Sequence, residues 1–224
     1  MTSSTTKNSL ITILSILVMI LIWYLLALSL GKEYILPTPA ATVKELLGIV
    51  SSANFWPAVL ATVSRGVLGF LISLLLGLLL GLLAGFSKAV FWLLQPWVTV
   101  IRSTPVMSVI ILAIIWFHSD VVPVMVTLLM LFPIIYGNVV AGIRNVDTDL
   151  LEMARMYKVK FRRIIGELYI PSILPYLLAG ASTAMGIAWK VIIAAEILSQ
   201  PTLAIGSRLM LAKINFATAQ VFAW

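Results

Sequence analysis

Long apolar runs constrain this chain more than any other feature of its sequence. The run from Leu10 to Leu30 contains no charged residue, and further apolar runs of similar length follow it. A membrane-spanning helix needs roughly 20 apolar residues, and these runs lack the strict alternation of barrel strands. Hydrophobic residues make up 62% of the chain and charged residues 10%, whereas soluble domains average about 45–50% and about 25%. The sequence therefore predicts an all-α integral membrane protein.

The runs divide into five complete transmembrane helices and the start of a sixth. We predict spans at 10–30, 57–86, 90–117, 121–143 and 172–198, with another helix beginning at 216–224. The first run also resembles a secretory signal peptide, because Ala27-Leu28-Ser29 has the small residues of a cleavage site. A signal-peptide core is typically about 7–15 residues long, so a retained first helix is favoured.

The distribution of basic residues predicts the orientation of these spans. Cytoplasmic loops of membrane proteins are enriched in Lys and Arg. With residues 1–9 in the cytoplasm, Lys7, Lys88 and the basic stretch after the fourth span lie inside. The charge-balanced segment 31–56, with a short amphipathic helix near 40–50, then lies outside. The C-terminus falls outside after five spans, so we expect the last helix to be truncated.

A row of residues at every fourth position along the second span is small apart from one arginine. The row consists of Ala61, Arg65, Gly69, Ser73, Gly77, Gly81 and Gly85. This spacing puts small side chains on one helical face, where a neighbouring backbone can approach closely. We therefore interpret Gly69, Ser73, Gly77, Gly81 and Gly85 as a helix-packing row, with Arg65 near the membrane edge, where its side chain can reach the interface.

Two groups of residues are candidates for a translocation pathway. Arg102, Thr104 and Pro105 lie where a proline breaks the third span, and such breaks are tolerated in a bilayer where protein or a wet cavity covers them. Met185, Trp189 and Glu196 share one stripe of the fifth span. Structural kinking and interhelix packing remain the alternatives, and Glu196 is close enough to the outer surface to be solvated.

A polar stretch from Arg144 to Pro175 interrupts the apolar pattern. It carries six of the fifteen Lys and Arg residues and four of the eight acids. Asp147 or Asp149 can cap a helix there, and Asp149 with Glu152 resembles a capping box. Apolar residues recur at helical spacing, while Arg155, Lys158 and Arg162 fall on another face. Such a helix suits anionic lipid headgroups or a groove on a soluble partner.

The same stretch resembles the EAA loop of permease subunits of binding-protein-dependent ABC importers. Glu152-Met153-Ala154 is followed nineteen positions after the Glu by the Pro of Ile170-Pro171. The family pattern has Glu-Ala-Ala, a Gly six residues after the Glu, and a Leu-Pro ending. Lys158 occupies the Gly position, and lysine is disfavoured in the left-handed conformation. The sequence alone therefore does not predict the sharp turn usually found between two short helices.

Further matches lie outside the loop, between about Leu60 and Gly206. The segments 94–96, 101–105, 114–117, 132–133, 142–147, 188–189 and 194–196 resemble the nitrate, sulfonate, taurine and bicarbonate branch of the MetI-like permeases. The resemblance implies a permease core at 57–224, after an extra first helix at 10–30, with a coupling loop at 144–170. It also implies a bacterial inner-membrane location, two cytoplasmic ATPase subunits, a second permease and an extracytoplasmic substrate-binding protein.

The resemblance also implies roles for individual residues. The residues expected to contact the ATPase are Leu151, Glu152, Ala154, Arg155, Tyr157, Lys158 and Pro171. The imported substrate is expected to be a small organic or inorganic anion or a vitamin precursor. ATP and Mg would be bound by the partner ATPase, and no cofactor by this chain.

Other functions fit the composition less well. The chain has no Cys and a single His, His118, which disfavours a metal or thiol site, and it lacks a GxxxxGK[ST] phosphate loop. The formal net charge of +7 is explained by basic residues beside spans, so nucleic acid is not expected as a partner. An ion-coupled secondary carrier using Lys190 and Glu196 is the main alternative, and a membrane enzyme is less favoured.

Overall fold

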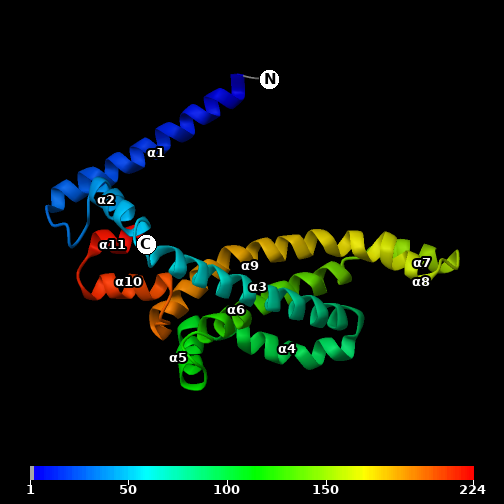
Figure 1. Cartoon of the computed structure of the whole chain (residues 1–224). Helices are drawn as coiled ribbons and strands as arrows, with labels where there is room; N and C mark the ends of the chain where they lie inside the picture. Colours follow the sequence, from blue (N-terminus) through cyan, green and yellow to red (C-terminus); the bar gives the residue numbers. More distant parts are fainter. Residues whose placement is uncertain (1–2) are drawn as a thin grey trace. The chain divides into compact units, whose positions relative to one another are not determined.

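The structure, a computed structural model, describes residues 3–224, and every regular element in that range is a helix. Side chains are described from residue 10 onward. The chain forms two compact units (Figure 1). One contains the described chain up to Val59 together with Leu203–Trp224, and the other contains Leu60–Thr202.

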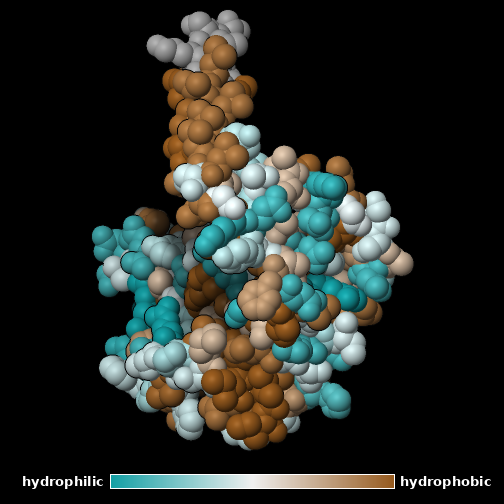
Figure 2. Space-filling view, turned by 90° about the vertical axis from the view of Figure 1, so that its left-hand side faces the viewer, coloured by the Kyte–Doolittle hydropathy of each residue, from teal (hydrophilic) through white to brown (hydrophobic). Residues whose placement is uncertain are grey.

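The first unit contains α1 (Ser3–Leu30), α2 (Pro39–Val50), α10 (Ile205–Ile214) and α11 (Thr218–Ala223). Hydrophobic side chains cover the face of α1 that Figure 2 shows, as expected for a helix surrounded by lipid. The Trp23 indole N–H donates to the Pro37 carbonyl over 3.0 Å. The helix predicted near 40–50 is present as α2, which begins with Thr38 as N-cap and Pro39 in the first turn.

The predicted N-terminal segment 1–9 is described only in part. Residues 1 and 2 lie outside the described residues, and α1 begins at Ser3 rather than Leu10. The helix therefore extends seven positions further toward the N-terminus than the apolar run alone predicts.

The second unit contains most of α3 (Phe55–Phe86), then α4 (Lys88–Ser103), α5 (Val106–Trp116) and α6 (Val122–Arg144). These are followed by α7 (Thr148–Met156), α8 (Phe161–Ile164), the π-helical turn η1 (Ile165–Tyr169) and α9 (Ile170–Ser199). Within the described residues, four helical stretches are long and apolar enough to span a membrane, at Leu10–Leu30, Phe55–Phe86, Val122–Arg144 and Phe161–Ser199.

The predicted span at 90–117 is two helices rather than one, so the count of five complete spanning helices stays a prediction. Its residues form α4 and α5, whose axes differ by 101°. Thr104 has ψ 126, the extended conformation favoured before a proline, and Pro105 has no N–H with which to continue α4. The pair is a broken span or a re-entrant loop, and counting it as a span raises the candidates from four to five.

Small residues of α3 allow its backbone to lie against α6 (Figure 1). A Cβ at Gly77 would lie 2.8 Å from Ile135 Cβ, and one at Gly81 would lie 2.8 Å from Val139 Cβ. Gly69 and Gly85 meet Thr127 and Ile143 in the same way. The Ser73 hydroxyl donates to the Gly69 carbonyl at 2.7 Å and the Leu128 carbonyl at 3.2 Å.

Helix α6 is also in close contact with α9 and α4. A Cβ at Gly180 of α9 would lie 2.8 Å from Asn138 Cβ. Val98 of α4 packs with Tyr136 and Val140 of α6, and the Arg144 guanidinium lies 3.7 Å from the centre of the Phe91 ring. Helix α6 is therefore the central element of this unit.

Adding one methyl group to the α3–α6 contact should destabilise the protein. We expect Gly81→Ala to lower its free energy of unfolding by about 1–3 kcal/mol, because the new Cβ overpacks against Val139. Thermal unfolding in detergent measures the effect. The control is Gly186→Ala on α9, where a Cβ meets no atom within 4 Å. This substitution should be neutral or slightly stabilising, because alanine favours the helix. Equal melting temperatures for the two variants would contradict this packing account.

Candidate functional site: the α7–α8 hairpin

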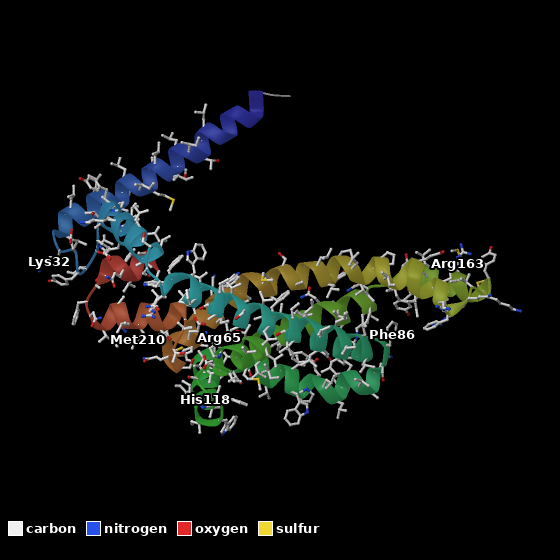
Figure 3. All side chains as sticks on the ribbon, viewed as in Figure 1. Lys32, Arg65, Phe86, His118, Arg163 and Met210 are labelled. Atoms are coloured by element: carbon white, nitrogen blue, oxygen red, sulfur yellow. The ribbon has the colours of Figure 1, made fainter. Side chains whose placement is uncertain are left out.

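The polar stretch folds into a helical hairpin at one end of the second unit. Figure 3 places Arg163 in this hairpin and Arg65 toward the other end of the unit. Helix α7 begins after Asp147, whose carboxylate accepts from the amides of Asp149 at 2.9 Å and Leu150 at 3.2 Å. The N-cap is therefore Asp147, and the alternative capping pair of Asp149 and Glu152 is wrong.

Helix α7 ends in a Schellman motif centred on Lys158. The Val159 amide donates to the Ala154 carbonyl at 2.9 Å, and the Lys158 amide donates to the Arg155 carbonyl at 3.0 Å. Lys158 has φ 52, in the left-handed region. The sharp turn is thus present although the sequence has no glycine there.

The second half of the predicted loop is helical and continues directly into α9. Residues Phe161–Ser199 run as α8, η1 and α9 without a break. The fifth helix therefore begins at Phe161, not near Ser172 as predicted. Arg163 forms an exposed ion pair with Glu167, with Nε and Oε1 2.7 Å apart. A force applied to α8 is transmitted along one helical rod.

A groove of about 230 Å³ lies between α7 and the α8–η1 segment. Its lining residues are Leu150, Met153, Ala154, Tyr157, Val159, Arg163, Ile164, Glu167 and Leu168. Ala154 is buried, with 8% of its surface exposed. Tyr157 is 78% exposed, and the neighbouring Met156 and Phe161 are also exposed. A small residue therefore lies at the base of the groove, and large apolar side chains surround it.

The residues predicted to contact an ATPase do not all lie at this groove. Glu152, Arg155, Tyr157, Lys158 and Pro171 are exposed, Leu151 is half-buried and Ala154 is buried. Among them, Ala154 and Tyr157 line the groove. Pro171 lies in the first turn of α9, away from the turn at Lys158.

The predicted pathway residues fall into separate groups. Arg102 and Pro105 are exposed and Thr104 is half-buried. Arg102 Nη2 lies 3.4 Å from the Pro133 carbonyl oxygen of α6, and the Thr104 hydroxyl donates to the Val100 carbonyl at 2.7 Å. On α9, Met185 is 37% and Trp189 39% exposed.

Glu196 is fully buried, so the expectation of a solvated carboxylate is wrong. The Arg65 guanidinium lies 3.1 Å from Glu196 Oε1 and 2.6 Å from Asp120 Oδ1, and the Thr62 hydroxyl donates to Glu196 Oε2 at 2.9 Å. Arg65 thereby joins α3, α9 and the turn before α6. The sequence offered one signal for this pair, since each residue carries a charge within a largely apolar span.

The helical spans and the exposed hairpin define the class of protein. The chain is a multi-pass, all-α membrane protein.

Comparison with known families then identifies the group to which it belongs. Residues 73–223 match the family described as the binding-protein-dependent transport system inner membrane component, and the chain belongs to this family of ABC transporter permeases.

Individual relatives support the same assignment. The chain is 34% identical over 209 residues to SsuC of Bacillus subtilis, a permease named for aliphatic sulfonate transport, covering 92% of this chain and 75% of that protein. It is 37% identical over 182 residues to SsuC of Escherichia coli, covering 80% and 68% of the two chains. The taurine transport permease TauC of Escherichia coli is 24% identical over 189 residues, covering 81% and 69%.

Glycine at position 158 should stabilise the hairpin. A residue with a Cβ pays roughly 1–2 kcal/mol in the left-handed conformation, so Lys158→Gly should increase the protection of the Val159 amide against hydrogen exchange about fivefold. Lys158→Ala is the matched control, because it removes the charge and keeps the Cβ. If alanine protects Val159 as much as glycine does, the effect of position 158 is electrostatic and this account is wrong.

Proposed function

We propose that this chain is the membrane-spanning permease subunit of an ATP-driven importer and that the α7–α8 hairpin docks the ATPase. The observation that carries the proposal is the groove with buried Ala154 at its base and exposed apolar side chains around it. Exposed aromatic and Met side chains beside a concave surface are typical of protein interfaces.

The hairpin is suited to transmit motion as well as to bind. The N-cap at Asp147 and the Schellman motif at Lys158 fix both ends of α7. Because α8 is continuous with α9, displacement of the docked hairpin moves a spanning helix as a rigid body. ATP binding by the partner would thereby reorient the pathway.

The assembly that we propose contains two ATPase subunits, which bind ATP and Mg, and a second permease that is another copy or a different chain. An extracytoplasmic binding protein delivers the substrate. The N-terminus and the hairpin lie in the cytoplasm, and residues 57–224 form the permease core. The chain itself catalyses no reaction, as its relatives are transport permeases.

The substrate that we propose is a small oxyanion. Relatives are named for aliphatic sulfonates, taurine and nitrate, and sulfonate and nitrate share a compact anionic group of oxygen atoms. Vitamin precursors remain a second class. The pathway lies along Arg102, Thr104, Pro105, Met185 and Trp189, and the buried Glu196–Arg65 pair fixes the helices at its other end.

Filling the groove should detach the ATPase. We expect Ala154→Leu to lower the amount of ATPase that co-purifies with the permease at least about tenfold, because the larger side chain occupies the space at the base of the groove. Pull-down of the tagged permease from membranes measures the stoichiometry.

Two further variants separate docking from local misfolding. Ala154→Ser keeps a small side chain and should retain the ATPase. Tyr157→Ala removes an exposed ring that contributes little to the fold, and it should also weaken co-purification. Full ATPase recovery with both Ala154→Leu and Tyr157→Ala would show that the hairpin is not the docking element.

A further inference from the structure

Arg102 has an unusual position for a charged residue. Its Nη2 lies 3.4 Å from the carbonyl oxygen of Pro133, which is the middle residue of the 23-residue helix α6. Eleven residues precede and eleven follow Pro133 in this helix, so it lies about 16 Å from each end. The guanidinium is therefore held near the middle of a spanning helix.

The Arg102 guanidinium lies against Gly137 of α6. A Cβ at Gly137 would lie 3.1 Å from Arg102 Nη2 and 3.8 Å from Cζ. The glycine therefore leaves the space that the guanidinium occupies beside α6. The contact with Pro133 is long for a hydrogen bond, whose usual range is about 2.7–3.2 Å.

No described carboxylate of the second unit forms an ion pair with Arg102. Of the eight acids, Glu33 and Glu45 belong to the first unit, and Asp147, Asp149, Glu152 and Glu167 belong to the hairpin segment. Asp120 and Glu196 are bound by Arg65. Among the described residues, no ion pair of Arg102 is found within 4.0 Å.

The sites of Glu196 and Arg102 thus differ in kind. Glu196 is fully buried and compensated by Arg65 and Thr62, as is usual for a structural ion pair. Arg102 is exposed on the surface of the chain, and one long contact to a carbonyl is the single hydrogen bond found for its five donors in the described part of the chain. A charged side chain at membrane depth is rare and is a candidate functional site, with a substrate or ion path among its roles.

We propose that Arg102 selects anions: its guanidinium, held against Gly137 and Pro133 at mid-span, binds the oxyanion during transit. This inference rests on the proposed permease function. The planar guanidinium presents paired N–H donors that match two oxygen atoms of a sulfonate or nitrate, whereas a lysine offers only a point charge. Arg102 therefore supplies both the charge and the geometry that an oxyanion requires.

The absence of cysteine from the chain allows a direct test. Ser103→Cys introduces one thiol at an exposed position next to Arg102. Membrane vesicles carrying the full chain are treated with a negatively charged sulfonatoethyl methanethiosulfonate or its positively charged trimethylammonium counterpart. The ratio of the two labelling rates, divided by the ratio for free cysteine, measures the local preference for anions.

We expect the anionic reagent to be favoured about tenfold or more, because a fixed positive charge raises the encounter rate of a negatively charged reagent. Adding Arg102→Gln should bring the ratio close to that of free cysteine, and Arg102→Lys should preserve most of it. The matched control is Lys88→Gln, which removes the same charge from the exposed first residue of the same helix and should leave the ratio unchanged.

Each contrary result has a definite meaning. A ratio near one with Arg102 present shows that the guanidinium creates no preference for anions, and it overturns the proposal. Absence of labelling by either reagent places Arg102 outside any water-filled path, and this result also overturns the proposal. ATP-driven uptake is measured in parallel: if it fails while the anion preference persists, the importer function is wrong and the anion site stands. Normal uptake by Arg102→Gln overturns the site and leaves the importer function intact.

Discussion

The backbone approach of α3 to α6 is the contact on which the rest of the second unit depends. Lipid is as apolar as the helix surfaces, so association within a bilayer relies on close packing rather than on the hydrophobic effect. Small residues at Gly69, Gly77 and Gly81 allow that packing against Thr127, Ile135 and Val139. Helix α6, fixed in this way, also contacts α4 and α9. Helix α6 therefore helps to position both Arg102 and α9. Helix α9 in turn continues from the hairpin.

Charges within the spans follow from the same environment. Insertion of a charged residue at the centre of a span costs about 2.5–3.5 kcal/mol on a translocation scale. The Glu196 carboxylate offsets this cost with Arg65 and Thr62, which ties α3 to α9 at the end of the unit opposite the hairpin. Arg102 has no ion pair within the described chain, and the anion binding that we propose would account for a charge at this position.

Local features of the sequence predicted part of this structure. The helical spans, helix α2 and an aspartate cap at the start of α7, at Asp147 or Asp149, follow from apolar run length and from capping and proline rules that act within a few residues. The structure selects Asp147. The family resemblance rested on residues such as Glu152, Ala154 and Pro171, and membership of that family is confirmed.

Features that depend on tertiary contacts could not be read in the same way. Lysine disfavours the left-handed conformation, yet position 158 adopts it, because the two hydrogen bonds of the Schellman motif outweigh a local preference. Pro105 permits a break between α4 and α5, but the size of the bend, 101°, does not follow from the proline alone. The pairing of Arg65 with Glu196 joins residues 131 positions apart, which no short-range pattern reveals.

The central claim is that this chain transports its substrate at the expense of ATP hydrolysed by a partner. The most direct measurement is uptake of a radiolabelled sulfonate or nitrate into proteoliposomes that contain the permease, its ATPase and its binding protein. The account predicts accumulation that requires ATP and is insensitive to collapse of the proton gradient. Accumulation driven by a proton gradient in the absence of ATP would contradict it and would favour an ion-coupled carrier.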